Sequence, residues 1–443
     1  MRFCSQEYLV VSFVSLSPSQ TKNLRTGYVA WAIVSLFFFY QYILRVFPGV
    51  MVNELRGDFS INAEQFSYFG AFYLYAYSLL QIPVGLLVDK IGVKKTVILS
   101  ILICLAGTGL IVFTHNLYLA YLSRILMGIG SACAFMCTLK IVADFLPPGK
   151  RGFLNGATLT LGVVGALVAG KPLSIAMDLF GWRHALLLTL IVGIGVLLLT
   201  IFLLKSPTIS HKTESIHEEK PSIIQVMKEI LSTPMVIVYA ILAVGLYTPL
   251  SVLADLWGVA YLMAKYGFAR GDAAEVSMTM YIGLCIGSLL LPWLSEKYNV
   301  LNRSIRVCTY GIFFAFACIL MAPQLPVMGI TVLILLLGAF GGAEMLCFTG
   351  VILYAPKGRT GITLGITNTV NMIGGALAQQ SVGLILDRFL WKGDLDVHGN
   401  HLYKSEDYAL AFSFLAVMIA LCCLVTRNLK KNTPCTKIEE CMT

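Results

Sequence analysis

The stretch Gly85-Leu-Leu-Val-Asp89-Lys90-Ile-Gly92-Val-Lys94-Lys95-Thr96 joins two long apolar runs of the chain. Its glycines allow a tight turn between helices, and its aspartate can lie against the positively polarised N-terminus of a neighbouring helix. Lysines next to an apolar run are typical of the cytosolic face of a membrane, where positive charge is favoured. The stretch therefore predicts a cytosolic loop between two transmembrane helices.

The composition of the 443-residue chain agrees with this interpretation. Hydrophobic residues make up 58% of it and charged residues only 12%, whereas soluble domains carry about 25% charged residues. The net charge of +9 is spread over short loops between apolar runs, so we expect a lipid bilayer as the partner and no nucleic acid. Most of the twelve cysteines lie inside apolar runs without a Cys-x-x-Cys pair, so we expect neither a metal nor a cofactor.

Apolar runs long enough to span a bilayer recur along the whole chain. A span needs about 20 mostly apolar residues, and a polar segment, 206–233, divides the runs into two sets of six. We expect helices at roughly 27–52, 64–88, 94–113, 117–141, 152–177, 183–204, 234–262, 273–295, 304–322, 325–354, 361–386 and 408–427. The expected fold is an all-α membrane protein with twelve transmembrane helices in two pseudo-symmetric six-helix bundles.

The bundles are expected at 27–205 and 234–427, with 206–233 as a linker and with tails at 1–26 and 428–443. Placing the N-terminus inside puts roughly three times as many Lys and Arg residues on that side as on the other. Both termini and the linker are therefore expected in the cytosol, with the protein in the cell membrane as a monomer.

The two sets of spans also repeat each other in sequence. The fifth and the eleventh span share a basic residue near their start, two glycines and a terminal aspartate. At one constant offset, Gly156, Gly165 and Asp178 correspond to Gly365, Gly374 and Asp387. A six-span internal repeat is typical of secondary transporters, which bind substrate near the midplane where the halves meet.

Two motifs resemble a known family. The opening stretch is similar, nearly position for position, to the loop signature G-x-L-x-D-x-x-G-[RK]-[RK] of the major facilitator superfamily of secondary transporters. The run Arg124-Ile-Leu-Met-Gly128-Ile-Gly130 resembles the fourth-helix signature R-x-x-x-G-x-G of the same superfamily. Together with the arginines of the repeat, the resemblance implies a gating or structural role for Gly85, Asp89, Gly92, Lys94, Lys95, Arg124, Gly128, Arg151 and Arg359.

Two of these residues carry more specific expectations. Arg124 is implied by the resemblance to be a buried charge, and the alternative is an arginine that extends to the outer interface. Asp89 is expected near the N-terminal end of the helix at 361–386, close to Arg359, when the protein opens outward. The second half carries only a degraded copy of the loop, between Gly283 and Arg306, so the contact is expected on one side only.

Charges inside the bilayer are costly unless they are paired or lie in a wet cavity, so they are candidate functional residues. Arg45 lies on the first span, with Gln41 four residues earlier on the same face. An arginine at this place resembles the organic-anion and sugar-phosphate branches of the superfamily, where it contacts the negative substrate. The alternative is an interfacial arginine near Pro48.

Two acids are candidates for proton coupling. Glu344 lies roughly 15 Å from the inner end of its span, near the middle of the bilayer, where burial favours a protonated carboxyl. The alternative is a fixed partner for a buried Lys or Arg. Asp255, nearer the outer end of the seventh span, is expected either to close the cavity or to pair with Arg45 across the halves.

Further polar residues share helix faces at helical spacing. Tyr73 and Tyr77 on the second span, and Asn368 and Asn371 on the eleventh, are candidates for lining a substrate cavity. Between the last two spans lie Asp394, Asp396, His398 and His401. This spacing would allow a metal site, but we expect a solvated loop instead.

These patterns favour one class of function over several others. The chain has no phosphate-binding Gly-x-x-x-x-Gly-Lys-[Ser/Thr] motif for an ATP-driven pump and no catalytic motif for a membrane enzyme, so we do not expect an enzyme. The expected function is secondary active transport of a small solute, an organic anion such as a carboxylate or a sugar phosphate, by alternating access, with H+ as a candidate coupling ion. The alternatives are a dipeptide or amino-acid transporter of the same superfamily and a nutrient sensor that does not transport.

Overall fold

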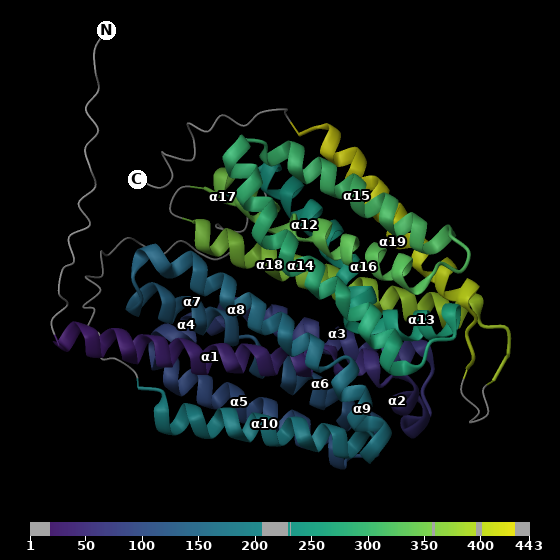
Figure 1. The fold of residues 1–443 in the computed structure, drawn as a ribbon, viewed down its shortest axis with the longest axis horizontal. Coiled ribbons are helices and arrows are strands. Elements are labelled where there is room, and N and C mark those ends of the chain that lie inside the picture. Colours follow the sequence, from purple (N-terminus) through teal and green to yellow (C-terminus); the bar gives the residue numbers. More distant parts are fainter. Residues whose placement is uncertain (1–17, 206–228, 231, 357–358, 396–400, 430–443) are drawn as a thin grey trace, which may run out of the picture.

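The computed structural model describes residues 18–205, 229–230, 232–356, 359–395 and 401–429, and nearly all of them are helical. The helices form two groups that lie side by side (Figure 1). The first half comprises α1 (Pro18–Val50), α2 (Val52–Phe59), α3 (Ala63–Leu79), α4 (Gln81–Ile91), α5 (Val93–Phe113), α6 (Leu117–Ser131), α7 (Ala134–Phe145), α8 (Pro148–Val168), α9 (Lys171–Phe180) and α10 (Trp182–Leu203).

The second half has the same organisation. It comprises α12 (Pro234–Val252), the π-helical turn η1 (Leu253–Trp257), α13 (Gly258–Tyr266), α14 (Arg270–Tyr298), α15 (Leu301–Met321), α16 (Val327–Gly341), α17 (Glu344–Tyr354), α18 (Thr360–Ile385), the π-helical turn η2 (Leu386–Leu390) and α19 (Ser405–Arg427). Within the expected linker 206–233, the structure describes residues 229–230, which are helical, and 232–233, which are not. Residues 206–228 and 231 lie outside the described residues.

Several neighbouring helices continue one another, as α3 with α4 and α16 with α17 do, so the described residues form twelve long rods. Ten of the described rods are long and apolar enough to cross a membrane, and the rods α3–α4 and α18 are the other two. The architecture is the expected all-α membrane fold with two six-rod halves. Helix α1 begins at Pro18 and not near 27, because polar residues beyond the bilayer can continue the helical hydrogen bonding.

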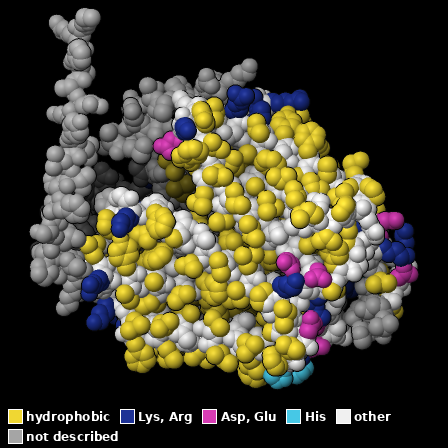
Figure 2. Space-filling view, viewed as in Figure 1, with side chains coloured by type: hydrophobic (Ala, Val, Ile, Leu, Met, Phe, Trp, Pro, Cys, Tyr) yellow, Lys and Arg dark blue, Asp and Glu magenta, His cyan; other side chains and the backbone are white. Residues whose placement is uncertain are grey.

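The rods give the molecule two ends. We call the end where α1 begins and α19 ends the terminal end, and the opposite end, which carries α2 and the start of α14, the distal end (Figure 1). Figure 2 shows a broad hydrophobic surface with charged side chains gathered toward the ends. This distribution fits a lipid-facing belt, because the bilayer interior accepts apolar side chains and excludes charges.

Glycines set the closest helix contacts. A Cβ atom added to Gly338 of α16 would overlap the carbonyl oxygen of Met280 on α14, and one added to Gly287 would overlap that of Ala339. In the first half, Gly128 of the fourth-helix motif approaches the backbone of Tyr73 in the same way. Small residues allow membrane helices to gain packing energy by close backbone approach, so Gly128 has the packing role that the motif implies.

The contact between α14 and α16 provides a test of this packing. We expect Gly338→Val to lower the free energy of unfolding by about 1–3 kcal/mol, because the new side chain overlaps backbone that cannot move aside. Thermal unfolding in detergent measures the effect as a lower melting temperature. Gly195→Val on α10 is the matched control, since a Cβ atom there meets nothing within 4 Å. Equal melting temperatures for the two variants would contradict the packing argument.

Candidate functional site

Arg45 of α1 and Asp255 of η1 form an ion pair between the two halves. The Nη2 and Nε atoms of Arg45 donate to Oδ2 of Asp255 at 2.6 and 3.0 Å. The side chains are only 9% and 3% exposed. The pairing that the sequence offered as one alternative for Asp255 is therefore present, and it joins residues that are 210 positions apart in the chain.

Local backbone geometry makes this pair possible. Asp255 lies in a π-helical turn, where one extra residue widens the helix and displaces the side chains that follow. A Cβ atom on Gly49 would lie 2.8 Å from the carbonyl oxygen of Asp255. The glycine therefore lets α1 approach η1 closely enough for Arg45 to reach the acid.

Three tyrosines complete what we call the Arg45 cluster, which consists of Arg45, Asp255, Tyr42, Tyr247 and Tyr281. Arg45 donates to the hydroxyl of Tyr247, and the hydroxyl of Tyr281 donates to Oδ1 of Asp255. The Arg45 guanidinium carbon lies 5.6 Å from the ring centroids of both Tyr42 and Tyr247. The buried charges are thus paired, hydrogen-bonded and surrounded by aromatic faces, which is how a low-dielectric site tolerates them.

Sequence reasoning did not assign these tyrosines a role. Tyr42 could have been found, because it lies three residues before Arg45 on the same helix. Tyr247 lies eight residues before Asp255 on the same rod, which is two helical turns, but aromatic residues at helical spacing are usually packing residues. Tyr281 comes from α14 and has no local sequence link to the site.

Arg124 is fully buried beside the cluster, so the alternative of an arginine that extends to the interface is wrong. Its guanidinium donates to the carbonyl oxygens of Leu44 at 2.5 Å, Phe69 at 2.6 Å and Arg45 at 3.3 Å. It also lies 4.8 Å from the ring centroid of Tyr73. Because it ties α6 to α1 and α3 through backbone oxygens, Arg124 holds the segment of α1 that carries Arg45.

Glu344 is buried at the first position of α17, directly after the break that separates α17 from α16. The side-chain amide of Asn371 donates to its Oε1 at 2.6 Å. Within the described residues, the Oδ1 atom of Asn371 has no hydrogen-bond partner. The expected alternative of a buried Lys or Arg as partner is not seen in the described part of the chain, where the hydrogen bond of Glu344 is to a neutral amide.

The remaining candidate lining residues fall into two groups. Tyr73 is buried and donates to Oε1 of Gln41 at 2.8 Å, so these two candidates bind each other. Tyr77 is half-buried and stacks against Tyr73 with ring centroids 6.3 Å apart. Asn368 is half-buried on α18. The structure therefore brings the lining candidates of the first half together, whereas Asn371 belongs with Glu344.

The residues of the opening stretch lie at the terminal end. Gly92 has φ of 83°, a conformation that glycine adopts easily, and it separates α4 from α5 as expected. Lys94 donates to the carbonyl oxygen of Ile201 at 2.8 Å, Lys95 is exposed, and a Cβ atom on Gly85 would lie 3.3 Å from Met136. The turn therefore ties α5 to the end of α10.

The predicted contact between Asp89 and Arg359 concerns a different state of the protein. The side chain of Asp89 lies outside the described residues, and Arg359 pairs with Glu229 at 2.7 Å. Arg151 donates to the carbonyl oxygen of Ala143 at 2.6 Å and closes the end of α7. The proposed gating role of Asp89 therefore stays a prediction.

Ion pairs between the halves gather toward the distal end. Among the described residues they are Arg45–Asp255, Arg270–Glu54, Arg270–Asp178, Lys171–Asp272, Lys171–Glu275 and Arg388–Glu64. At the same end the ring of His401 stacks on that of Trp391 with centroids 3.6 Å apart, and its Nδ1 lies 2.8 Å from Oδ1 of Asp387. Asp394 is exposed, as expected for a solvated loop. Asp396 and His398 lie outside the described residues. The described ion pairs therefore join the two halves mainly at the distal end.

Removing one partner of the buried pair should be worse than removing both. We expect Arg45→Met to lower the free energy of unfolding by about 3–5 kcal/mol, because Asp255 is left buried without its cation. Combining it with Asp255→Leu should restore most of this loss, since no uncompensated charge remains. Thermal unfolding in detergent of both single variants and the double variant gives the coupling energy.

The exposed pair Lys171–Glu275 is the control, since solvent screens an exposed pair and its removal should hardly change the melting temperature. Additive effects of Arg45→Met and Asp255→Leu would show that the two side chains do not depend on each other.

Comparisons with known proteins agree on one family. The family model for the Major Facilitator Superfamily matches residues 32–379. The chain is 30% identical over 187 residues to the uncharacterized transporter YybO of Bacillus subtilis, an alignment that covers 42% of each chain and so less than half of that relative. It is 24% identical over 411 residues to the gentisate transporter of Corynebacterium glutamicum, covering 90% of this chain and 88% of that one.

The fold has solved counterparts. A bacterial homologue of the human lysosomal transporter Spinster, in an inward-facing and occupied conformation, superimposes with a TM-score of 0.71 at 16% identity, covering 95% of this chain and 99% of that one. At this identity the likeness concerns the fold alone. The family model covers more than half of the chain, from α1 into α18, and includes every residue of the Arg45 cluster. This protein therefore belongs to the Major Facilitator Superfamily.

Proposed function

We propose that this protein is a secondary transporter that moves a small organic anion across the membrane by alternating access. The observation that carries the proposal is the buried ion pair of Arg45 and Asp255, which joins the two halves. A carboxylate or phosphate of a substrate offers Arg45 the same acceptor geometry as the aspartate. When the substrate anion replaces Asp255 at Arg45, the buried guanidinium keeps a negative partner. The ion pair then no longer joins the two halves, and the second half can move.

The chemistry around Arg45 supports an organic anion. Tyr42 and Tyr247 offer aromatic faces and hydroxyls next to the guanidinium, which suits a small anion with an apolar or hydroxylated body. The relative from Corynebacterium glutamicum is named for gentisate, an aromatic carboxylate. A sugar phosphate satisfies the same requirements, whereas a dipeptide or amino acid also needs an acceptor for its ammonium group, for which Asp255 is the candidate.

We assign the two acids different roles. Asp255 is held by Arg45 and Tyr281, so we propose that it acts as the counter-ion that the substrate displaces. Glu344 binds a neutral amide, and Asn371 keeps an unsatisfied oxygen within the described residues. A protonated Glu344 can donate to that oxygen after the amide turns over, so both protonation states of Glu344 have a partner. We therefore propose Glu344 as the group that exchanges a proton.

The orientation belongs to the same proposal. The terminal end carries the motif lysines and lies in the cytosol, and the distal end faces outside, with both termini cytosolic in the cell membrane. In this orientation the ion pairs between the halves lie on the outer side. We further propose that the monomer is the transporting unit, because the Arg45 cluster is formed within one chain.

Uptake into proteoliposomes tests the role of Arg45. We expect Arg45→Lys to reduce uptake of labelled aromatic carboxylates and sugar phosphates by about tenfold or more, because lysine keeps the charge but loses bidentate binding. Arg183→Lys is the matched control, since Arg183 pairs with Asp58 inside the first half, away from the Arg45 cluster. Unchanged anion uptake by Arg45→Lys would refute the substrate role of Arg45. Ligand-dependent thermal stabilisation without any uptake would favour the sensor.

An imposed pH gradient tests the role of Glu344. We expect wild-type uptake to rise with an inward proton gradient, and Glu344→Gln to lose this response while it still exchanges internal for external substrate, because the amide imitates a carboxyl that is always protonated. Asp255→Asn should instead impair both uptake and exchange, since it removes the counter-ion of Arg45. Wild-type uptake that ignores the gradient would exclude proton coupling, and equal behaviour of the two variants would refute the separate roles.

A further inference from the structure

The N-terminus of α3, in the first half, is capped by side chains of the second half. Asn62, the residue before α3, and Gln65 cap each other locally. Oδ1 of Asn62 accepts from the backbone N–H of Gln65 at 2.8 Å, and Oε1 of Gln65 accepts from the backbone N–H of Asn62 at 3.2 Å. The two amides between them have partners elsewhere. The N–H of Ala63 donates to the hydroxyl of Tyr403 at 3.2 Å, and that of Glu64 donates to Oδ2 of Asp387 at 2.6 Å.

First-turn amides have no acceptor inside their own helix and need one from elsewhere. A carboxylate is the best acceptor there, because the helix N-terminus is positively polarised and the hydrogen bonds are charge-assisted. Two of the four amides at the start of α3 are therefore satisfied only while the second half lies against the first at the distal end. When the halves separate there, these amides lose their acceptors to water.

Asp387 is held firmly in this position. It lies in the turn η2 at the end of α18, and its side chain is only 4% exposed. Its Oδ1 binds Nδ1 of His401 at 2.8 Å and accepts from the hydroxyl of Tyr403. Burial, followed by the hydrogen bond and the charge of Asp387, raises the pKa of Tyr403 above its ordinary value, so the phenol stays protonated and able to donate.

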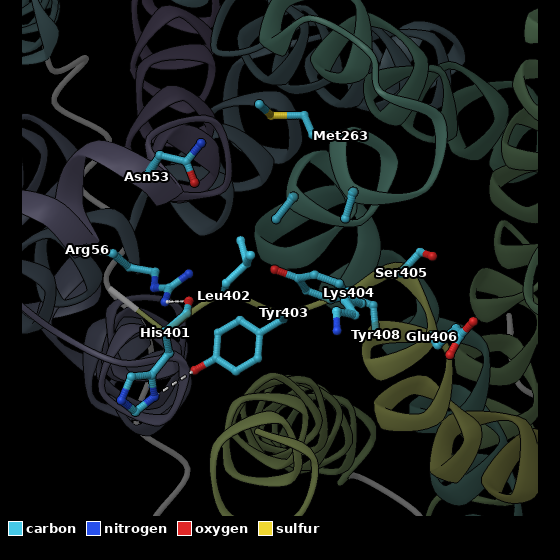
Figure 3. A pocket seen from close by; sticks show the side chains of 12 residues that line it. Asn53, Arg56, Met263, His401, Leu402, Tyr403, Lys404, Ser405, Glu406 and Tyr408 are labelled. Carbon is cyan, nitrogen blue, oxygen red and sulfur yellow. Dashed lines mark hydrogen bonds between the residues drawn. The ribbon is translucent and has the colours of Figure 1, made fainter. Parts of the chain in front are cut away.

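The contacts around the cap bind the same two surfaces. Arg56 of α2 donates to the carbonyl oxygen of His401 at 2.6 Å and lies 5.0 Å from the ring centroid of Tyr403, at one wall of the pocket in Figure 3. Arg388 donates to both carboxylate oxygens of Glu64 at 2.8 Å. The cap is therefore the centre of a wider contact between α2 and α3 on one side and the segment that follows α18 on the other.

The internal repeat offers a built-in comparison. Asp178 of the first half corresponds to Asp387 and also faces the other half, but its side chain is 60% exposed and its ion pair is with the side chain of Arg270 at 3.5 Å. At the start of α14, the backbone N–H groups of Asp272 and Ala273 donate to the carbonyl oxygen of Ala269, which belongs to the same half. The two pseudo-symmetric acids thus differ: Asp387 caps a helix of the opposite half, whereas the contact of Asp178 with the other half that the described residues show is a long, exposed ion pair.

We propose that the contact between the halves at the distal end is a gate, the distal gate, and that Asp387, oriented by Tyr403 and His401, is its latch. The latch is closed when Asp387 caps α3 of the opposite half, and it is released each time the halves separate at this end. The proposal rests on the alternating access proposed above for its place in the transport cycle. Asp178 contributes little to holding the halves together. The distal gate is therefore asymmetric, and Asp387 of the second half controls its opening.

Hydrogen exchange measured by mass spectrometry on the full-length protein in lipid nanodiscs tests the latch without a substrate. We expect Asp387→Ala to speed exchange of the peptide that covers the first turn of α3 by about tenfold, as loss of a helix cap does. Exchange should also rise in α2 and at the start of α14, because both are covered only when the halves meet at the distal end. Asp178→Ala, the matched control, should leave the α3 peptide unchanged.

Several results would overturn the proposal. Faster exchange in α3 alone would show a plain helix cap without a gate, and equal effects of Asp387→Ala and Asp178→Ala would remove the asymmetry. Faster exchange across the core of α14 and α16 would show that Asp387→Ala is poorly folded. In that case the variant Tyr403→Phe tests the latch instead. It removes only the hydroxyl that binds Ala63 and Asp387, and no change in the α3 peptide would refute the latch. Failure of transport assays with an intact exchange response would count against the transporter and not against the latch.

Discussion

The buried contact between Arg45 and Asp255 is the interaction on which the arrangement of the halves depends. Placing either charge alone inside the bilayer costs several kcal/mol, so each residue constrains where the other can lie. Because the two charges belong to different halves, this electrostatic requirement also fixes the position of one bundle against the other. Gly49, the π-helical turn at Asp255 and the carbonyl contacts of Arg124 all serve the same geometry. A substrate that competes for Arg45 would therefore act on the whole interface.

The two ends of the molecule are held by different chemistry. At the distal end, ion pairs and a helix cap cross between the halves, and their carboxylates include the well-buried Asp387. At the terminal end, Arg359 binds Glu229 beside its own helix start, and Lys94 binds α10 within the first half. Polar contacts of this kind have definite donors and acceptors, so they are either made or broken as the halves move. Such contacts suit a protein with two discrete states better than an apolar interface that could slide.

Some residues of the site had no recognisable signal in the sequence. Tyr281 and Tyr403 are single tyrosines among twenty, and a phenol becomes important only through the carboxylate that it meets. The polar neighbours of His401 in the chain predict a solvated loop, and they give no sign that its ring stacks on Trp391 and that its Nδ1 binds Asp387. Asp387 corresponds to Asp178 in the internal repeat. The repeat alone gives no reason to expect different roles for the two acids. The different burial of the two acids depends on His401 and Tyr403, which contact Asp387.

The sequence by itself determined the all-helical membrane fold, the two six-helix halves and the presence of Arg45, Asp255, Arg124 and Glu344 inside apolar spans. These features follow from span length, hydropathy and helical period, which are local and can be read along the chain. Only the tertiary structure decided the partners: Arg45 with Asp255, Glu344 with Asn371, and Asp387 with the start of α3. Helical period tells which face a side chain occupies, but not which of eleven other helices lies opposite. That choice is made by packing and by the need to pair buried charges, and both act between residues hundreds of positions apart.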